Sequence, residues 1–268
     1  MKKPKNILEI FKLLEKSNCR QCGETTCLAF AQAIFMGYKP PEMCPKLDSL
    51  TIELLSRKAD DLEALEKNGY EYLKTLKSRI ADIDLAAAAK KIDAQFTDNK
   101  LTLKVLGKDF SVDINGNLSA DIHINPWIAV PYLNHIIYGK GIPVSGEWVS
   151  FRELKGGGER YRLFKKRCET HIKQIADTKT SFFDDMVHLF SGKQVKKYFK
   201  SDISVILNVL PKMPVMICYW YPEDGLESSL HIFFDKTADK NLDIDSIDIL
   251  TEGLARMFAG LTLRHGIA

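Results

Sequence analysis

Residues 18–27 read NCRQCGETTC, and a fourth cysteine follows in Cys44-Pro45, which gives the spacing C-x2-C-x4-C-x16-C. The remaining two cysteines, Cys168 and Cys218, stand alone far downstream. A disulfide framework is typical of short secreted chains, whereas clustered cysteines in an intracellular chain indicate metal or redox chemistry. The cysteine-rich stretch therefore indicates a metal-binding or redox-active module in the N-terminal part of the chain.

The cysteine spacing suits an iron–sulfur cluster. A [4Fe-4S] cluster is held by four thiolates, and two cysteines separated by two residues can reach it from one tight loop. Gly23 lets the backbone turn close to the sulfides, because it has no Cβ. A helix is expected to begin at Cys27, and the N–H groups at a helix start favour the cluster's negative charge. The pattern predicts one [4Fe-4S] cluster held by Cys19, Cys22, Cys27 and Cys44.

A structural zinc site is the main alternative for the four cysteines. Such sites usually combine two Cys-x2–4-Cys pairs, often with histidine. Only Cys19 and Cys22 form such a pair, and no histidine precedes His123. The spacing therefore favours the cluster, while zinc, or four ordinary core cysteines, stays open as an alternative.

Three short segments, Asn18–Gly23, Thr26–Ala31 and Cys44-Pro45, resemble the four-cysteine module of the corrinoid iron–sulfur protein large subunit. The same module occurs in the B subunit of Rnf-type electron-transport complexes. The resemblance covers residues 5–48 and implies a low-potential [4Fe-4S] cluster at the four cysteines. In the corrinoid protein the module lies near the cobalt centre and serves its reductive activation.

The rest of the chain does not resemble that corrinoid protein. It lacks the Asp-x-His-x-x-Gly motif with which corrinoid-binding domains ligate cobalt. Residues 146–157, GEWVSFRELKGG, are similar instead to an uncharacterised domain that often follows this cluster module in proteins of anaerobes. The resemblance thus implies the cluster and leaves the role of the second domain open.

Bulk composition excludes several classes of function. The 38 basic and 35 acidic residues give a net charge of +3, too balanced for a nucleic-acid-binding face. No stretch reaches the roughly 18 consecutive apolar residues that a membrane span needs. Glu9 and Lys12 interrupt the apolar residues near the start, so we expect no export signal and a cytoplasmic protein.

Hydrophobic periodicity predicts an α+β fold in three parts. Residues 1–50 form the cluster module, residues 51–95 a helical connector and residues 96–268 an α+β domain. The third part mixes helices and strands without the regular alternation that a parallel sheet requires. Its clearest local signals are a hairpin turn at Asn115-Gly116 and a helix over 126–138 that opens on Pro126.

Later segments of the third part carry further local signals. Residues 159–190 are mostly helical, with a break near 178–181. Three strand-like runs follow at 204–210, 214–221 and 229–235. The last helix is expected over 246–263, with Asp245 or Ser246 as its cap.

Two features of the α+β domain could bind a cofactor. Glycines open a helix within a basic stretch, a setting that suits an anion or a corrinoid's nucleotide tail. The residues concerned are Lys155, Gly156, Gly157, Gly158 and Arg160. Trp220, where a strand meets a loop, could line a pocket for a flat ligand. The alternatives are a plain strand-to-helix connection and a core aromatic.

No constellation of catalytic residues can be placed from the sequence, and whether the protein is an enzyme stays open. A cluster held by four protein thiolates has no open iron, which favours electron transfer. We expect delivery of electrons to a group on the α+β domain, first a corrinoid such as cobalamin, with a redox protein or corrinoid protein as partner. The alternative is a structural or redox-sensing cluster beside a binding module.

Overall fold

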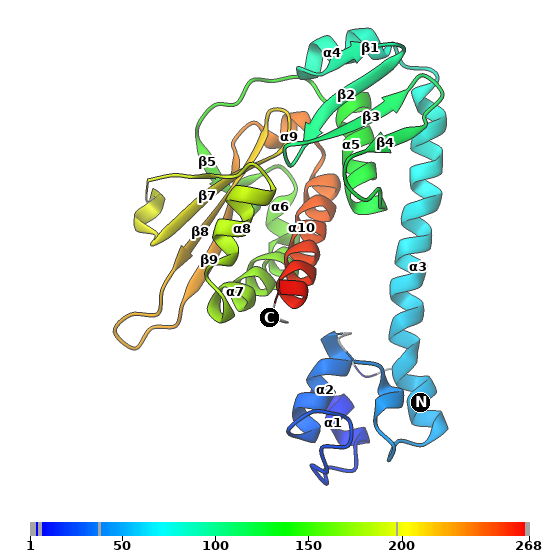
Figure 1. Ribbon diagram of the computed structural model, residues 1–268, viewed down its shortest axis with the longest axis vertical. Helices are drawn as coiled ribbons and strands as arrows, with labels where there is room; N and C mark the ends of the chain where they lie inside the picture. Colours follow the sequence, from blue (N-terminus) through cyan, green and yellow to red (C-terminus); the bar gives the residue numbers. More distant parts are fainter. Residues whose placement is uncertain (1–3, 5–6, 37–38, 197, 266–268) are drawn as a thin grey trace. The chain divides into compact units, whose positions relative to one another are not determined.

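The computed structural model describes residues 4, 7–36, 39–196 and 198–265, and the chain divides into two compact units, Met1–Tyr70 and Glu71–Ala268 (Figure 1). Among these residues, the side chains of 35–36, 53–54, 56–68 and 262–265 are not described. One long helix, α3 (Ser49–Ile80), begins in the first unit and ends in the second. The predicted boundaries at 50/51 and 95/96 stay predictions.

The first unit is built from short helices. They are α1 (Ile7–Leu13), α2 (Cys27–Met36), the 3-10 turn η1 (Pro41–Met43) and the start of α3. Thr26 caps the start of α2, because its hydroxyl accepts a hydrogen bond from Ala29 N at 3.0 Å. The predicted helix start at Cys27 is confirmed. A small apolar cluster joins these elements, and its buried side chains are Ile10, Leu14, Cys22, Phe30, Ala31, Ile34, Cys44 and Leu55.

The second unit opens with helix α4 (Leu85–Ile92) and a four-stranded antiparallel sheet in the order β1-β2-β3-β4. Its strands are Gln95–Thr97, Lys100–Val105, Lys108–Asp113 and Leu118–Ala120. Helix α5 (Pro126–Tyr138) packs on this sheet, where the Tyr132 hydroxyl lies 3.3 Å from both Leu101 O and Phe110 O. The predicted turn at Asn115-Gly116 joins β3 to β4, and Gly116 has φ 79°.

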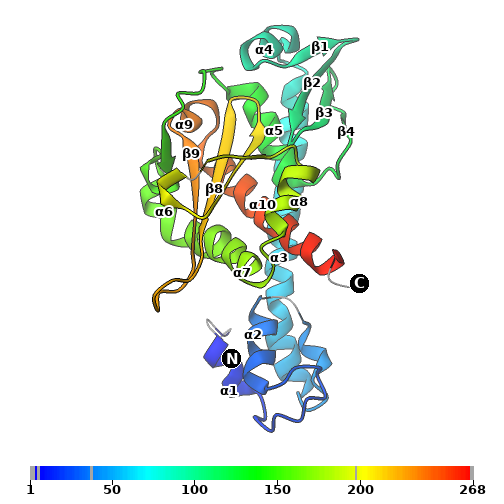
Figure 2. The same ribbon diagram turned by 60° about the vertical axis from the view of Figure 1, so that its left-hand side comes forward.

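A second antiparallel sheet has the order β5-β9-β8-β7-β6. Its strands, in sequence order, are Trp148–Ser150, Lys193–Gln194, Ile203–Leu210, Met213–Trp220 and Ser229–Asp235. Helices gather on one side of this sheet (Figures 1 and 2). They include α6 (Gly157–Phe164), the π-helical turn Lys165–Glu169, α7 (Thr170–Thr178), α8 (Phe182–Leu189) and α10 (Ile244–His265). The short helix α9 (Ala238–Asn241) follows β9.

Antiparallel sheets and separate helices confirm the α+β prediction. The predicted break near 178–181 falls between α7 and α8, and Cys168 and Cys218 are buried as expected of core residues. The predicted cap of the last helix, Asp245 or Ser246, is wrong. Asp243 is the cap, because its carboxylate accepts hydrogen bonds from both Ser246 N and Ser246 Oγ. No helix in the described ranges is long and apolar enough to cross a membrane.

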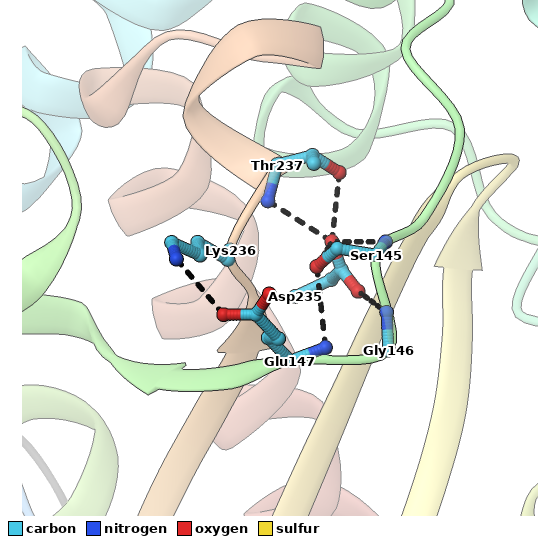
Figure 3. A network of polar contacts seen from close by, with 6 residues as sticks. All are labelled: Ser145, Gly146, Glu147, Asp235, Lys236 and Thr237. Carbon is cyan, nitrogen blue, oxygen red and sulfur yellow. Dashed lines mark hydrogen bonds and ion pairs between the residues drawn. The ribbon is translucent and has the colours of Figure 1, made fainter.

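A buried carboxylate fixes the end of β9. Asp235 is 1% exposed, and its oxygens accept hydrogen bonds from the backbone N–H groups of Ser145, Gly146 and Thr237 at 2.8–3.0 Å. Two hydroxyls, Ser145 Oγ and Thr237 Oγ1, also donate to it (Figure 3). These five donors bring the loop before β5 and the turn after β9 together around one charge.

Replacing Asp235 should destabilise the protein strongly. In Asp235→Asn the amide group presents donors where the native carboxylate accepts, so buried N–H groups lose their partners. Losses of this kind cost about 3 kcal/mol or more of the free energy of unfolding. Urea unfolding followed by circular dichroism measures the loss. Glu227→Gln, at an exposed loop position, is the matched control and should be close to neutral.

Acid should weaken the same junction. Burial raises the pKa of Asp235, but the hydrogen bonds from Ser145, Thr237 and Gly146 outweigh it and leave the pKa below its usual value. The carboxylate therefore stabilises the fold above its unfolded pKa of about 4, and this contribution is lost as the pH falls through the lower folded value. As the pH is lowered, the free energy of unfolding should decline less steeply in Asp235→Asn than in the native protein. Equal slopes for the two proteins would contradict this account.

Candidate functional site

The loop between α1 and α2 carries Cys19 and Cys22, and Cys27 follows it as the first residue of α2. Its backbone turns sharply, with left-handed φ angles at Lys16, Asn18, Arg20 and Gly23. The Asn18 side chain accepts a hydrogen bond from Cys27 N at 2.8 Å, which ties the start of the loop to the start of α2. This hydrogen bond holds the two ends of the loop together without any contribution from a bound ligand.

The four thiols share one region but differ in exposure. Cys22 and Cys44 are buried in the apolar cluster of the first unit, and partly buried Cys27 packs against the same cluster. Cys19 is exposed. All four are free thiols, so no disulfide competes for them. Three sulfur atoms thus line one apolar region, with the fourth at the surface.

Two lysines lie beside this loop. Lys39 Nζ donates to Cys22 O at 3.2 Å and forms an ion pair with Glu24 at 2.8 Å. Lys46 pairs with Glu15 at 2.7 Å. The Glu15 carboxylate raises the pKa of Lys46. The cysteine region is therefore bordered by two lysine–glutamate ion pairs.

The thiols fit a thiolate-bound metal by their chemistry and by their common location. Free thiols on a tight loop, with one at the first residue of a helix, are the donor set that such a group requires. No group of three or more Cys, His, Asp or Glu side chains stands in metal-binding geometry within the described part of the chain. Binding would therefore require the loop to draw its sulfur atoms together.

The glycine run has structural partners of its own. Gly156 has φ 81° and precedes α6, and Lys155 N donates to Asp239 at 2.8 Å. The Arg160 guanidinium pairs with Asp245, at the start of α10. Gly157 is the constrained position, because a Cβ there would lie 1.9 Å from Phe151 O. Gly158 faces more open space, 3.6 Å from Arg152 O. Anion binding by this run stays a prediction.

Trp220 lies apart from the glycine run along the sheet. It pairs with Ser229 at one end of the β8–β9 ladder, whereas β5, which leads into the run, pairs with the Phe233–Asp235 end of β9. Its ring is half-buried and lies 5.7 Å from the His231 ring. Among the described residues, no contact joins Trp220 to residues 155–160, so the two predicted ligand features lie in different places.

Substitutions in the glycine run separate packing from ligand binding. Gly157→Ala should destabilise the protein by about 2 kcal/mol or more, because the new methyl group clashes with a backbone carbonyl that cannot move aside freely. Gly158→Ala is the matched control and should be neutral or slightly stabilising, since alanine favours a helix. Thermal unfolding of both variants provides the measurement, and equal melting temperatures would contradict the close contact.

Comparison with known proteins identifies the second unit. Residues 84–257 match the family described as "Domain of unknown function (DUF3786)", which is more than half of the chain. The chain therefore belongs to this family. Residues 14–46 match a second family, described as "Putative Fe-S cluster". This second match includes all four clustered cysteines and supports an iron–sulfur protein.

Curated relatives match the N-terminal segment. Subunit gamma of the acetyl-CoA decarbonylase/synthase complex from Methanopyrus kandleri is 42% identical over 48 residues, 18% of this chain and 10% of the relative. The corrinoid/iron-sulfur protein large subunit of Moorella thermoacetica is 42% identical over 52 residues, 19% and 12% of the two chains. The chain thus spans only a small part of these relatives. No solved structure matches it.

Proposed function

We propose that this protein transfers electrons through one [4Fe-4S] cluster to a group bound by its DUF3786 domain, and that this group is a corrinoid. The observation that carries the proposal is the set of four free thiols in the segment that matches an iron–sulfur family. When bound, the cluster would supply one-electron chemistry at low potential. The residues that would hold it are Cys19, Cys22, Cys27 and Cys44.

The difference in burial among the thiols supports electron transfer. Cys22, Cys27 and Cys44 face apolar neighbours, which would shield most of a bound cluster from water. Cys19 is exposed, so one corner of the cluster would lie near the surface, where a donor or acceptor protein can approach. With all four ligands from protein, no iron is left open for substrate, and Lewis-acid catalysis is disfavoured.

The choice of a corrinoid rests on the named relatives of the N-terminal segment. One is a corrinoid/iron-sulfur protein, and others are gamma subunits of a multi-protein acetyl-CoA complex. Association by resemblance is a weaker argument than a site, because function belongs to the site and not to the fold. We further propose a redox partner protein or corrinoid protein as the physiological partner, in the cytoplasm of an anaerobe.

Anaerobic purification and reduction test the proposal directly. The protein should contain iron and acid-labile sulfide, and dithionite should reversibly bleach its broad absorbance near roughly 400 nm. Mixing the reduced protein with cob(II)alamin should then produce cob(I)alamin, as each cluster gives up a single electron. A reducible cluster that transfers nothing to cobalamin would favour the alternative of a redox sensor beside a binding module. One zinc without sulfide would overturn both.

Cysteine substitutions test the ligand assignment. Cys19→Ser and Cys44→Ser should lose most of the cluster, because a hydroxyl is a poor replacement for a thiolate ligand. Cys168→Ser is the matched control, since the buried Cys168 lies in the core of the second unit and should leave the iron and sulfide content unchanged. Equal iron loss in all three variants would show that the ligands have been assigned wrongly.

A further inference from the structure

Aromatic side chains line the face of the second sheet that points away from the helices α7 and α10. Along β9, Leu230, Ile232 and Phe234 belong to the core, so the alternating His231 and Phe233 lie on the opposite face. Six rings lie there in a continuous series, which we term the aromatic face. Its members, in order of contact, are Trp148, Tyr198, Phe199, Phe233, His231 and Trp220.

The outer part of this face is held in place although it is exposed. Tyr198 and Phe199 are 41% and 51% exposed, yet the Phe199 ring stacks on Phe233 with centroids 4.4 Å apart. Phe199 and Lys200 both have left-handed backbone, with φ 49° and 59°. Bulky residues rarely adopt this conformation, and strain of this kind is concentrated at functional sites. The backbone therefore keeps an aromatic ring on the surface.

One side chain on the aromatic face lies beside a buried carboxylate. His231 Nδ1 lies 3.5 Å from Oε1 of Glu169, a residue that is only 2% exposed. Glu169 is itself fixed, because its oxygens also accept from Ile232 N and from the Tyr161 hydroxyl, each at 3.2 Å. The π-helical turn Lys165–Glu169 places this carboxylate, and such turns are frequent at functional sites.

This arrangement leaves the other nitrogen of His231 available. The His231 side chain is 40% exposed, and no described residue forms a hydrogen bond with its Nε2. Histidines that bind metals commonly donate their second ring N–H to a carboxylate, which fixes the ring and raises its basicity. His231 and Glu169 are the two residue types found in such a pair, with His231 as the metal ligand and Glu169 as the carboxylate beside it.

A bare metal ion would be poorly held at this position. No set of three or more Cys, His, Asp or Glu ligands is arranged for a metal in the described ranges, so His231 offers a single donor. A metal that brings four equatorial ligands of its own needs only one more from the protein. The broad apolar face of a corrin ring also suits contact with aromatic side chains.

We propose that the aromatic face binds a corrinoid whose cobalt takes Nε2 of His231 as an axial ligand, with Glu169 as the positioning residue. The proposal rests on the proposed function, in which the DUF3786 domain holds a corrinoid, and it names the site. The Nε2 lone pair forms the bond to cobalt and displaces a bound water, while the Nδ1 proton stays directed at Glu169. Cobalt keeps its oxidation state in this step.

The test uses the full-length protein, purified without oxygen, and cob(II)inamide, a corrinoid without a nucleotide base of its own. The bound complex should show splitting by one nitrogen in its electron paramagnetic resonance spectrum. His231→Gln should abolish this splitting and weaken binding at least tenfold. His188→Gln, at an exposed position on α8, is the matched control and should change neither.

Two further variants separate positioning from packing. Glu169→Gln should retain cobinamide but reduce the nitrogen splitting, because the imidazole then donates less electron density to cobalt. Phe199→Ala should weaken binding and leave the splitting unchanged, since it removes only a stacking surface. Circular dichroism of each variant confirms that it is folded. A splitting that Glu169→Gln does not alter would contradict the positioning role.

Three other outcomes would refute the proposed corrinoid site, and the proposed electron-transfer function is tested separately. Absence of cobinamide binding, unchanged splitting in His231→Gln, or binding of hemin alone would each refute this corrinoid site. The iron and sulfide content and the dithionite response are measured on the same samples. A protein that still reduces cobalamin without ligation by His231 would retain the proposed function and lose only the proposed site.

Discussion

Strand β9 pairs along its length with β8 on one side, but on the other side β5 pairs with only three of its residues. The packing around β9 in the second unit depends on how the remaining edge is satisfied. Strand β5 covers β9 only from Phe233 to Asp235. Beyond it, the buried N–H of Ile232 has no strand partner and must find another acceptor, because an unpaired buried donor is costly. Glu169 supplies that acceptor, and the π-helical turn delivers it. At the other end Asp235 fastens the segments that flank β5 and β9.

The carboxylates of Asp235 and Glu169 differ in the partners that they contact. Asp235 accepts five hydrogen bonds and has a purely internal set of partners. Glu169 bonds a backbone N–H and a tyrosine hydroxyl and still faces the ring of His231 at the surface. A single buried charge thus serves both the strand edge and an exposed side chain. This sharing distinguishes the Glu169 position from an ordinary structural acid.

Local patterns predicted much of the architecture. The α+β class, the turn at Asn115-Gly116, helix α5 and the three long strands all follow from periodicity and turn residues that act over a few positions. The cap of α10 was placed wrongly because several aspartates surround the helix start, and only the packed structure selects Asp243. The roles of Glu169 and Asp235 were missed because they depend on partners more than 60 residues away in the chain.

The spacing of the cysteines predicts a metal site, which stays a prediction, and it does not predict the surroundings of that site. Nothing in the sequence indicates that Cys22 and Cys44 are core residues and Cys19 is exposed. Burial also makes two of the proposed ligands part of the small apolar core of the first unit. The same side chains would therefore both hold the metal and hold the helices together. Folding of this unit would then be coupled to iron supply, so that a cell short of iron would lose the unit itself and not merely its redox activity.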